Sequence, residues 1–64
     1  MWNMTNAEII TALASEAKCD ERTARRALEH GYMTIRTRDL RDRIAFALRR
    51  RPELGTQYSK DHYP

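Results

Sequence analysis

Apolar residues recur at helical spacing in three separate stretches of the chain. The first stretch follows Thr5, and Glu8 stands three residues after that threonine, which is the capping-box pattern of a helix start. Polar residues separate the members of its apolar stripe, which are Ile9, Ile10, Leu13, Ala14 and Ala17. This spacing predicts an amphipathic helix over residues 6–16.

The second stretch is short and opens at Asp20, whose carboxylate suits a helix N-cap. Its apolar side includes the small residues Ala24 and Ala27, which allow a close approach to the first helix. Gly31 follows, and a glycine in the left-handed conformation commonly closes a helix. The pattern predicts a helix over residues 21–29, joined to the first helix by a tight turn. Such a pair is a helix-turn-helix.

The third stretch carries an apolar stripe that begins after Thr37 and ends before Pro52. Thr37 suits the N-cap, and Asp39 places a negative charge in the first turn, where the helix dipole favours it. The inward members of the stripe are Leu40, Ile44, Ala47 and Leu48. We predict a helix over residues 38–50. Phe46 falls off the stripe, so it either wraps around the edge of the core or takes part in a dimer contact.

Two stretches lack a helical period. Residues 32–36 alternate apolar and polar positions, but no second run follows to form a hairpin, so we predict an extended loop with Met33 or Ile35 in the core. After the third helix no apolar period is found, which predicts a mobile C-terminal tail over residues 52–64. The expected architecture is all-α, a compact three-helix domain with a helix-turn-helix over residues 1–51.

The basic residues are concentrated in the middle of the chain. Residues 18–51 contain eleven Lys and Arg against five Asp and Glu, a local charge of +6, whereas the flanks carry one basic residue against four acidic ones. An uneven basic block of this kind favours a polyanionic partner, with DNA or RNA ahead of acidic lipid. The alternative is an arginine-rich surface that is only solvated.

The sequence offers no pattern for catalysis or metal binding. A chain of 64 residues buries only about 60% of the surface that its unfolded form exposes, which leaves little room for a substrate pocket. Cys19 is the single cysteine and suits a small apolar plug between helices. The histidines and this cysteine show no zinc spacing. We therefore expect no enzyme, cofactor or metal. Without a secretory or membrane-spanning segment, we expect a cytoplasmic, nucleoid-associated protein.

The second predicted helix carries the residues that we expect to read DNA. Arg22 and Arg26 lie on the side opposite its alanines, and a bidentate arginine is the commonest reader of guanine in the major groove. Glu21 either accepts a hydrogen bond from a cytosine amine or only serves the helix dipole. Contacts to phosphates are expected from Lys18, Arg25, Tyr32, Arg36, Arg38 and Arg41. For Tyr32 and Arg36 the alternative is a side chain that only faces solvent.

These residues give the segment from Leu13 to Leu48 a resemblance to the DNA-binding headpiece of the lactose-repressor family of bacterial regulators. That family shows an Ala-Gly-Val-Ser turn, then Thr-Val-Ser-Arg-Val-Leu-Asn, and later a capped helix with Thr-Arg-Glu-Arg-Val. The corresponding segments here are Leu13-Ala14, Ala17-Lys18-Cys19-Asp20, Thr23-Ala24-Arg25-Arg26-Ala27-Leu28-Glu29, and Thr37 followed by Arg41-Asp42-Arg43-Ile44.

The resemblance covers a little over half of the chain and implies its fold and its docking on DNA. It places Glu21 and Arg22 at the base-reading start of the recognition helix, and Thr23 and Arg26 at positions that touch DNA. For Thr23 we expect a phosphate contact. Lys18 stands where the family has a turn glycine, and the loop after the second helix is about two residues longer than in the family. The sequence shows neither the hinge helix nor the effector domain of the family, so no small-molecule effector is expected.

One recognition helix reads only a few base pairs. We therefore expect either a homodimer on a two-fold site, with half-sites about 34–36 Å apart, or a larger protein partner. A rival interpretation is a three-helix adaptor that binds a regulator or polymerase through Trp2, Phe46 and Tyr32. Trp2 alternatively packs over the first helix as a lid. A phage or plasmid excision factor is a further alternative.

Overall fold

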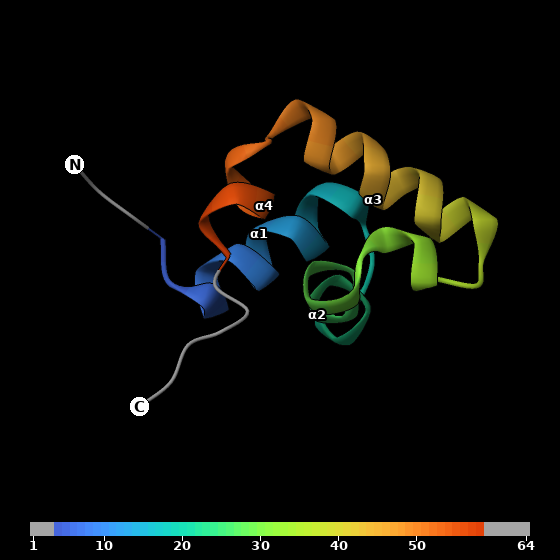
Figure 1. Cartoon of the computed structure of the whole chain (residues 1–64), viewed down its shortest axis with the longest axis horizontal. Coiled ribbons are helices and arrows are strands. Elements are labelled where there is room, and N and C mark those ends of the chain that lie inside the picture. Colours follow the sequence, from blue (N-terminus) through green and yellow to red (C-terminus); the bar gives the residue numbers. More distant parts are fainter. Residues whose placement is uncertain (1–3, 59–64) are drawn as a thin grey trace.

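The computed structural model describes residues 4–58, which fold into helices gathered around the first of them (Figure 1). The elements are α1 (Asn6–Ala17), α2 (Glu21–His30), the short 3-10 helix η1 (Tyr32–Thr34), α3 (Arg38–Arg50) and α4 (Glu53–Gln57). Helix α1 packs against α2, α3 and α4. The predicted all-α class and its three main helices are confirmed, and their ends lie within one residue of the predicted ones.

The ends of α1 show why the helix forms where it does. The Thr5 hydroxyl oxygen accepts a hydrogen bond from the Glu8 amide (3.2 Å), and the Glu8 carboxylate accepts one from the Thr5 amide (2.9 Å), so the predicted capping box is confirmed. At the other end, Lys18 takes the left-handed conformation, with φ 56° and ψ 52°. The amide of Cys19 then donates to the Ala14 carbonyl oxygen (3.0 Å). Lys18 thus occupies a backbone conformation that glycine adopts at lower cost.

Replacing Lys18 by glycine is therefore expected to stabilise the domain. Relief of the left-handed strain outweighs the extra freedom of the unfolded chain, for a net gain of about 0.5–1 kcal/mol. Thermal unfolding followed by circular dichroism should show a rise in Tm of about 2–8 °C. Lys18→Ala is the matched control, since it removes the same charge but keeps Cβ. A glycine variant no more stable than the alanine variant would contradict this account.

Helix α2 is joined to α1 by the predicted tight turn. The Asp20 carboxylate accepts a hydrogen bond from the Thr23 amide (2.8 Å), which confirms the predicted N-cap. Ala24 is fully buried and Ala27 nearly so, which allows the close packing of α2 on α1. Gly31 ends the helix with φ 91° and ψ 145°. The predicted left-handed closure is therefore wrong in its ψ, although the positive φ still favours glycine.

The segment between α2 and α3 differs from the predicted extended loop. Residues 32–34 form the single 3-10 turn η1, which the Thr34 hydroxyl supports by donating to the Gly31 carbonyl oxygen (2.8 Å). Ile35 is the residue that enters the core, at 6% exposure, whereas Met33 is 70% exposed. Thr37 is the N-cap of α3 as predicted, but its side chain makes no capping hydrogen bond.

The core lies between α1, α2 and α3 and is closed by α4. Its fully buried large side chains are Ile9, Leu13, Ile44 and Leu54. Leu54 shows that the predicted start of the tail is wrong, because residues 53–57 form α4 and pack onto α1 and α3. The Gln57 side chain also accepts a hydrogen bond from the Met4 amide (3.1 Å). The remainder of the predicted tail, residues 59–64, lies outside the described residues, as does Trp2.

Candidate nucleic-acid interface

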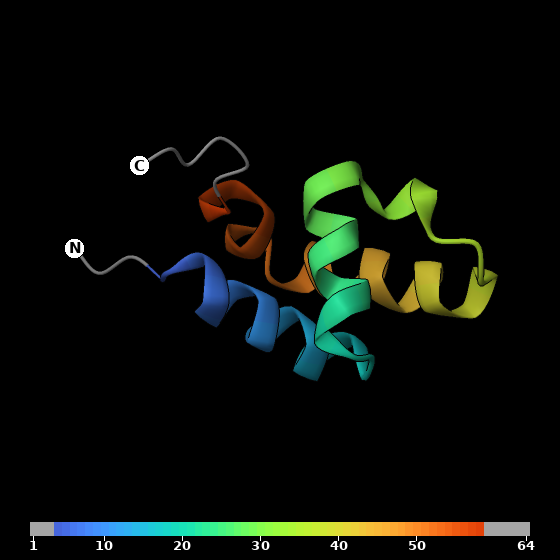
Figure 2. The same ribbon diagram turned by 90° about the horizontal axis from the view of Figure 1, so that it is seen from below.

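Helix α2 lies across α1 and α3 on one side of the molecule (Figure 2). Its buried face consists of Ala24, Ala27 and Leu28. Arg22 and Arg26 are one helical turn apart on the opposite face, and both are exposed. Within residues 4–58, neither side chain forms a hydrogen bond or an ion pair. Both guanidinium groups are thus free to bind an external acceptor.

Arg26 also borders a surface hollow of about 420 Å³ between α2 and the start of α3. Arg36 stands on the other side of this hollow and is exposed. Its remaining lining is Thr23, Thr34, Ile35, Thr37 and Leu40. Arg26 and Arg36 therefore bring two guanidinium groups to one hollow beside the first turn of α3. Such groups are suited to hold phosphate oxygens.

Arg25 differs from Arg22 and Arg26 because it forms an ion pair with a carboxylate of the same helix, that of Glu29. Its Nε lies 3.3 Å from Oε2 of Glu29, and the Tyr58 hydroxyl donates to that same oxygen at 2.8 Å. The hydrogen bond from Tyr58, followed by the one from Arg25, holds the pKa of Glu29 below its usual range. Burial, and then the bond to Glu29, raises the pKa of Tyr58. Arg25 thus contributes less free charge than Arg22 or Arg26.

Glu21 is exposed, and its carboxylate has a partner on α1. It accepts a hydrogen bond from the Thr11 hydroxyl (3.1 Å), and it lines a hollow between α1 and α2 together with Ile10, Arg22 and Arg25. The hydrogen bond from Thr23, followed by the charge of Arg22 among smaller effects, lowers the pKa of Asp20. Asp20 and Glu21 therefore each accept a hydrogen bond inside the domain, whereas the Arg22 side chain makes none within residues 4–58.

The other predicted phosphate contacts fall into two groups. Lys18 and Arg38 are exposed and their side chains make no hydrogen bond or ion pair within residues 4–58, and Tyr32 is 39% exposed. Arg41, by contrast, is partly buried, and its Nη1 donates to the carbonyl oxygen of Ile35 at 3.4 Å. The structure therefore brings the Arg41 side chain to the loop before α3, and leaves the side chains of Lys18, Arg36 and Arg38 without a partner inside residues 4–58.

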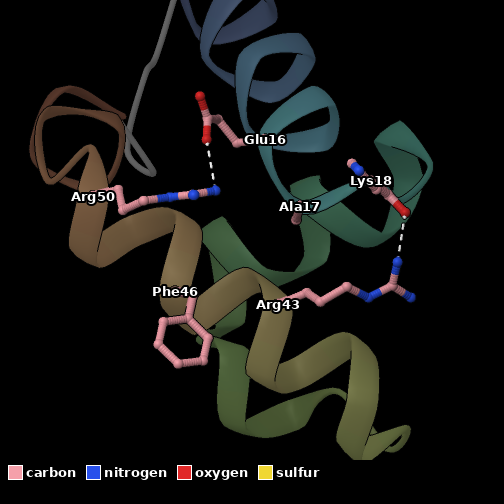
Figure 3. A pocket seen from close by; sticks show the side chains of 6 residues that line it. All are labelled: Glu16, Ala17, Lys18, Arg43, Phe46 and Arg50. Carbon is pink, nitrogen blue, oxygen red and sulfur yellow. Dashed lines mark hydrogen bonds and ion pairs between the residues drawn. The ribbon is translucent and has the colours of Figure 1, made fainter.

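Arg43 has a structural role that the sequence did not predict. Its Nη1 donates to the Lys18 carbonyl oxygen at 3.1 Å (Figure 3). Its Nη2 lies 3.1 Å from Oδ2 of Asp39. The same side chain leaves its Nε buried without a partner. Arg43 thus ties α3 to the turn of the helix-turn-helix. Only the i, i+4 spacing of Asp39 and Arg43 could have indicated part of this arrangement.

The Phe46 side chain lies on the outer side of α3 and is 61% exposed. Figure 3 shows Arg43 and Arg50 reaching from α3 toward the end of α1, where Arg50 pairs with Glu16 at 3.1 Å, while the Phe46 ring reaches neither partner. The alternative that placed Phe46 against the core edge is therefore wrong. The two hollows beside the ring are lined by residues of α3 and of the end of α1, including Lys18.

Cys19 is partly buried beside the helix-turn-helix, and burial, followed by the charge of Asp20, raises the pKa of its thiol. A raised pKa keeps the thiol protonated and unsuited to nucleophilic attack at neutral pH. Among residues 4–58, no group of three or more His, Cys, Asp and Glu is placed to hold a metal ion.

None of the helices in the described part has the length and apolar character needed to cross a membrane. No protein-family model, no curated protein and no solved structure matches the chain.

Proposed function

We propose that this chain binds double-stranded DNA in a sequence-specific manner, as a small regulator that places α2 in the major groove. The observation that carries the proposal is the free pair of arginines on α2. Arg22 and Arg26 are exposed, point away from the buried alanines, and are held by no carboxylate of residues 4–58. Arg43 and Arg50, by comparison, are bound to groups of the domain itself. An unpaired guanidinium can donate two hydrogen bonds to the O6 and N7 acceptors of a guanine edge.

The shape of the domain suits this docking. The major groove of B-DNA is about 12 Å wide and admits one α-helix. Helix α2 lies on one side of the molecule with α1 and α3 behind it, so its outer face is available to such a groove (Figure 2). The turn before α2 is fixed by the Asp20 cap and by Arg43, which holds the Lys18 carbonyl. Because α2 is already held in place before it meets DNA, less conformational entropy is lost on binding.

The cations around α2 supply a second element, the contacts to phosphates. Lys18 lies at the turn before α2, and Arg36 and Arg38 lie at the start of α3. None of these three is paired within residues 4–58, and Arg36 shares its hollow with Arg26. In this arrangement α2 reads bases, while the flanking cations bind phosphates and fix the register of α2 along the DNA. The resemblance to the lactose-repressor headpiece leads to the same docking.

Selection from random duplexes tests the proposal directly. The full chain is incubated with a random duplex library, bound DNA is recovered over a few rounds, and the enriched sequence is compared with a scrambled duplex by fluorescence anisotropy. Binding of three phosphates predicts a slope of about −2.7 for log K against log salt. Affinity should then fall about 40-fold between 50 and 200 mM salt.

Two results would contradict the proposal. One is a selection that enriches no sequence, which would leave at most a non-specific polyanion binder. The other is binding that does not respond to salt, because contacts to phosphates release counterions whatever the base sequence. Amide chemical-shift mapping provides the positional check, since perturbation by the selected duplex should centre on residues 18–41. Indifference of these amides to DNA would favour the rival adaptor.

A further inference from the structure

The outer side of α3 carries an exposed stripe that the proposed DNA contacts do not use. Phe46 is its centre and, at 61%, one of the most exposed large apolar side chains of the described residues. Asp42 and Arg49 are exposed, and Ala45 is partly so. These four residues line one surface hollow of about 320 Å³. The stripe therefore combines an aromatic ring, a small residue beside it, and one charge of each sign.

The order of these residues makes the stripe complementary to itself. Asp42 stands three positions before Ala45, and Arg49 stands three positions after Phe46. The four residues are thus symmetric about the midpoint between Ala45 and Phe46, with opposite charges at the two ends. When two copies of such a helix meet antiparallel about a two-fold axis at this midpoint, Asp42 of each copy faces Arg49 of the other. Phe46 of each copy then lies over Ala45 of the other.

The charges of the stripe are available for such a contact. Within residues 4–58, Asp42 and Arg49 form no ion pair, although both signs of charge are close by on α3. Their neighbours are already engaged, since Arg43 pairs with Asp39 (3.1 Å) and Arg50 pairs with Glu16 (3.1 Å). Of the charged residues within four positions of Phe46, Asp42 and Arg49 are therefore the two without an ion pair inside residues 4–58, and they lie symmetrically about the midpoint between Ala45 and Phe46.

We propose that the outer side of α3 is an antiparallel, two-fold interface with a second copy of this chain. Two symmetric Asp42–Arg49 pairs set the direction and register of the helices. The two Phe46 rings supply the apolar contact, each entering the hollow beside Ala45 of the other copy. An interface of this type is isologous and closes at the dimer. The interface does not depend on the proposed DNA binding, since α2 contributes no residue to it.

The small size of the stripe sets the strength that we expect. One stripe on a helix of 13 residues buries less surface than the roughly 1,200 Å² at which stable interfaces begin, so the dimer belongs to the transient class. Sedimentation velocity of the full chain, without DNA, should follow association up to about 1 mM protein. The weight-average mass should rise from 7.6 kDa toward twice that value.

Charge reversal tests the register. Asp42→Arg and Arg49→Asp each turn two attractive pairs into two repulsive ones, and each is expected to weaken association at least about tenfold. The double variant Asp42→Arg/Arg49→Asp restores opposite charges across the two-fold axis and should associate within about threefold of the original chain. Phe46→Ser should abolish association. All three positions are at the surface, so circular dichroism should show an unchanged fold.

Three outcomes would overturn the interface. The first is a chain that stays monomeric over the whole concentration range. The second is a double variant that associates no better than the single variants, because this excludes the antiparallel register. The third is association that Phe46→Ser leaves intact. A DNA titration of Phe46→Ser separates this proposal from the previous one, since loss of the dimer leaves the arginines of α2 in place.

Discussion

Replacing both Arg22 and Arg26 by alanine is expected to remove the preference of the chain for its selected duplex. Each bidentate contact between an arginine and guanine is worth about 1–3 kcal/mol of discrimination, so the loss of both should weaken specific binding at least about 30-fold. Fold stability should change little, because both side chains are exposed and make no contact within residues 4–58 that the fold needs. Fluorescence anisotropy with the selected and scrambled duplexes measures the effect.

Lysine at the same two positions separates base reading from simple charge. A lysine keeps the positive charge but replaces the planar, two-pronged donor with a single ammonium group. The Arg22→Lys/Arg26→Lys variant should therefore bind scrambled DNA nearly as well as the original chain and keep its salt dependence. Its preference for the selected duplex should fall nearly as far as that of the alanine variant.

A charge-matched pair at the end of α3 provides the control. Arg50 and Arg51 are already held by carboxylates, with Arg50 3.1 Å from Glu16 and Arg51 3.1 Å from Glu53. Replacing both by alanine removes the same net charge as the α2 double variant, but it should have only a small effect on the preference for the selected duplex. Equal losses from the two pairs would show that the affinity reflects net charge alone, and the assignment of Arg22 and Arg26 would be wrong.

The parts of the fold that local sequence specifies were predictable. Thr5 with Glu8, and Asp20 with the Thr23 amide, are contacts over three residues, so the beginnings of α1 and α2 could be read from the chain. The exposure of Arg22 and Arg26 was predictable for a similar reason. Once Ala24 and Ala27 face the core, the period of the helix leaves the two arginines on the opposite side.

The parts that depend on distant residues were not predictable. Arg43 finds the Lys18 carbonyl oxygen, and Tyr58 finds Glu29, only after α1, α2 and α3 have packed. Neither pairing follows from spacing along the chain, because 25 residues separate the first pair and 29 separate the second. The position of Glu21 has the same origin, since its partner Thr11 lies on another helix. Whether a polar side chain on a helix surface is free or hydrogen-bonded thus depends on which residues of other helices pack next to it.

Helix α4 is the clearest example of an element that could not be predicted from the local sequence. Truncation of its core residue, Leu54, should have a larger effect on stability than the other substitutions proposed. Leu54 is fully buried, although the segment around it contains no apolar period that marks a helix. Truncation of a buried leucine to alanine costs about 2–5 kcal/mol. A domain of this size has about 5–15 kcal/mol of stability at most to lose. Leu54→Ala should therefore lower the urea midpoint strongly or leave much of the protein unfolded at 25 °C.

Substitution of the adjacent glycine, Gly55, provides a control, because it should raise stability where Leu54→Ala lowers it. Gly55 lies inside α4, and a Cβ there would meet the Leu48 Cδ2 at 3.8 Å, an ordinary van der Waals contact. Gly55→Ala should therefore stabilise the domain by about 0.5–1 kcal/mol, because alanine loses less backbone freedom than glycine in a helix. Were residues 53–57 part of a tail, both substitutions would leave the unfolding midpoint unchanged. Opposite shifts from adjacent positions require both a formed helix and a side chain buried against α1 and α3.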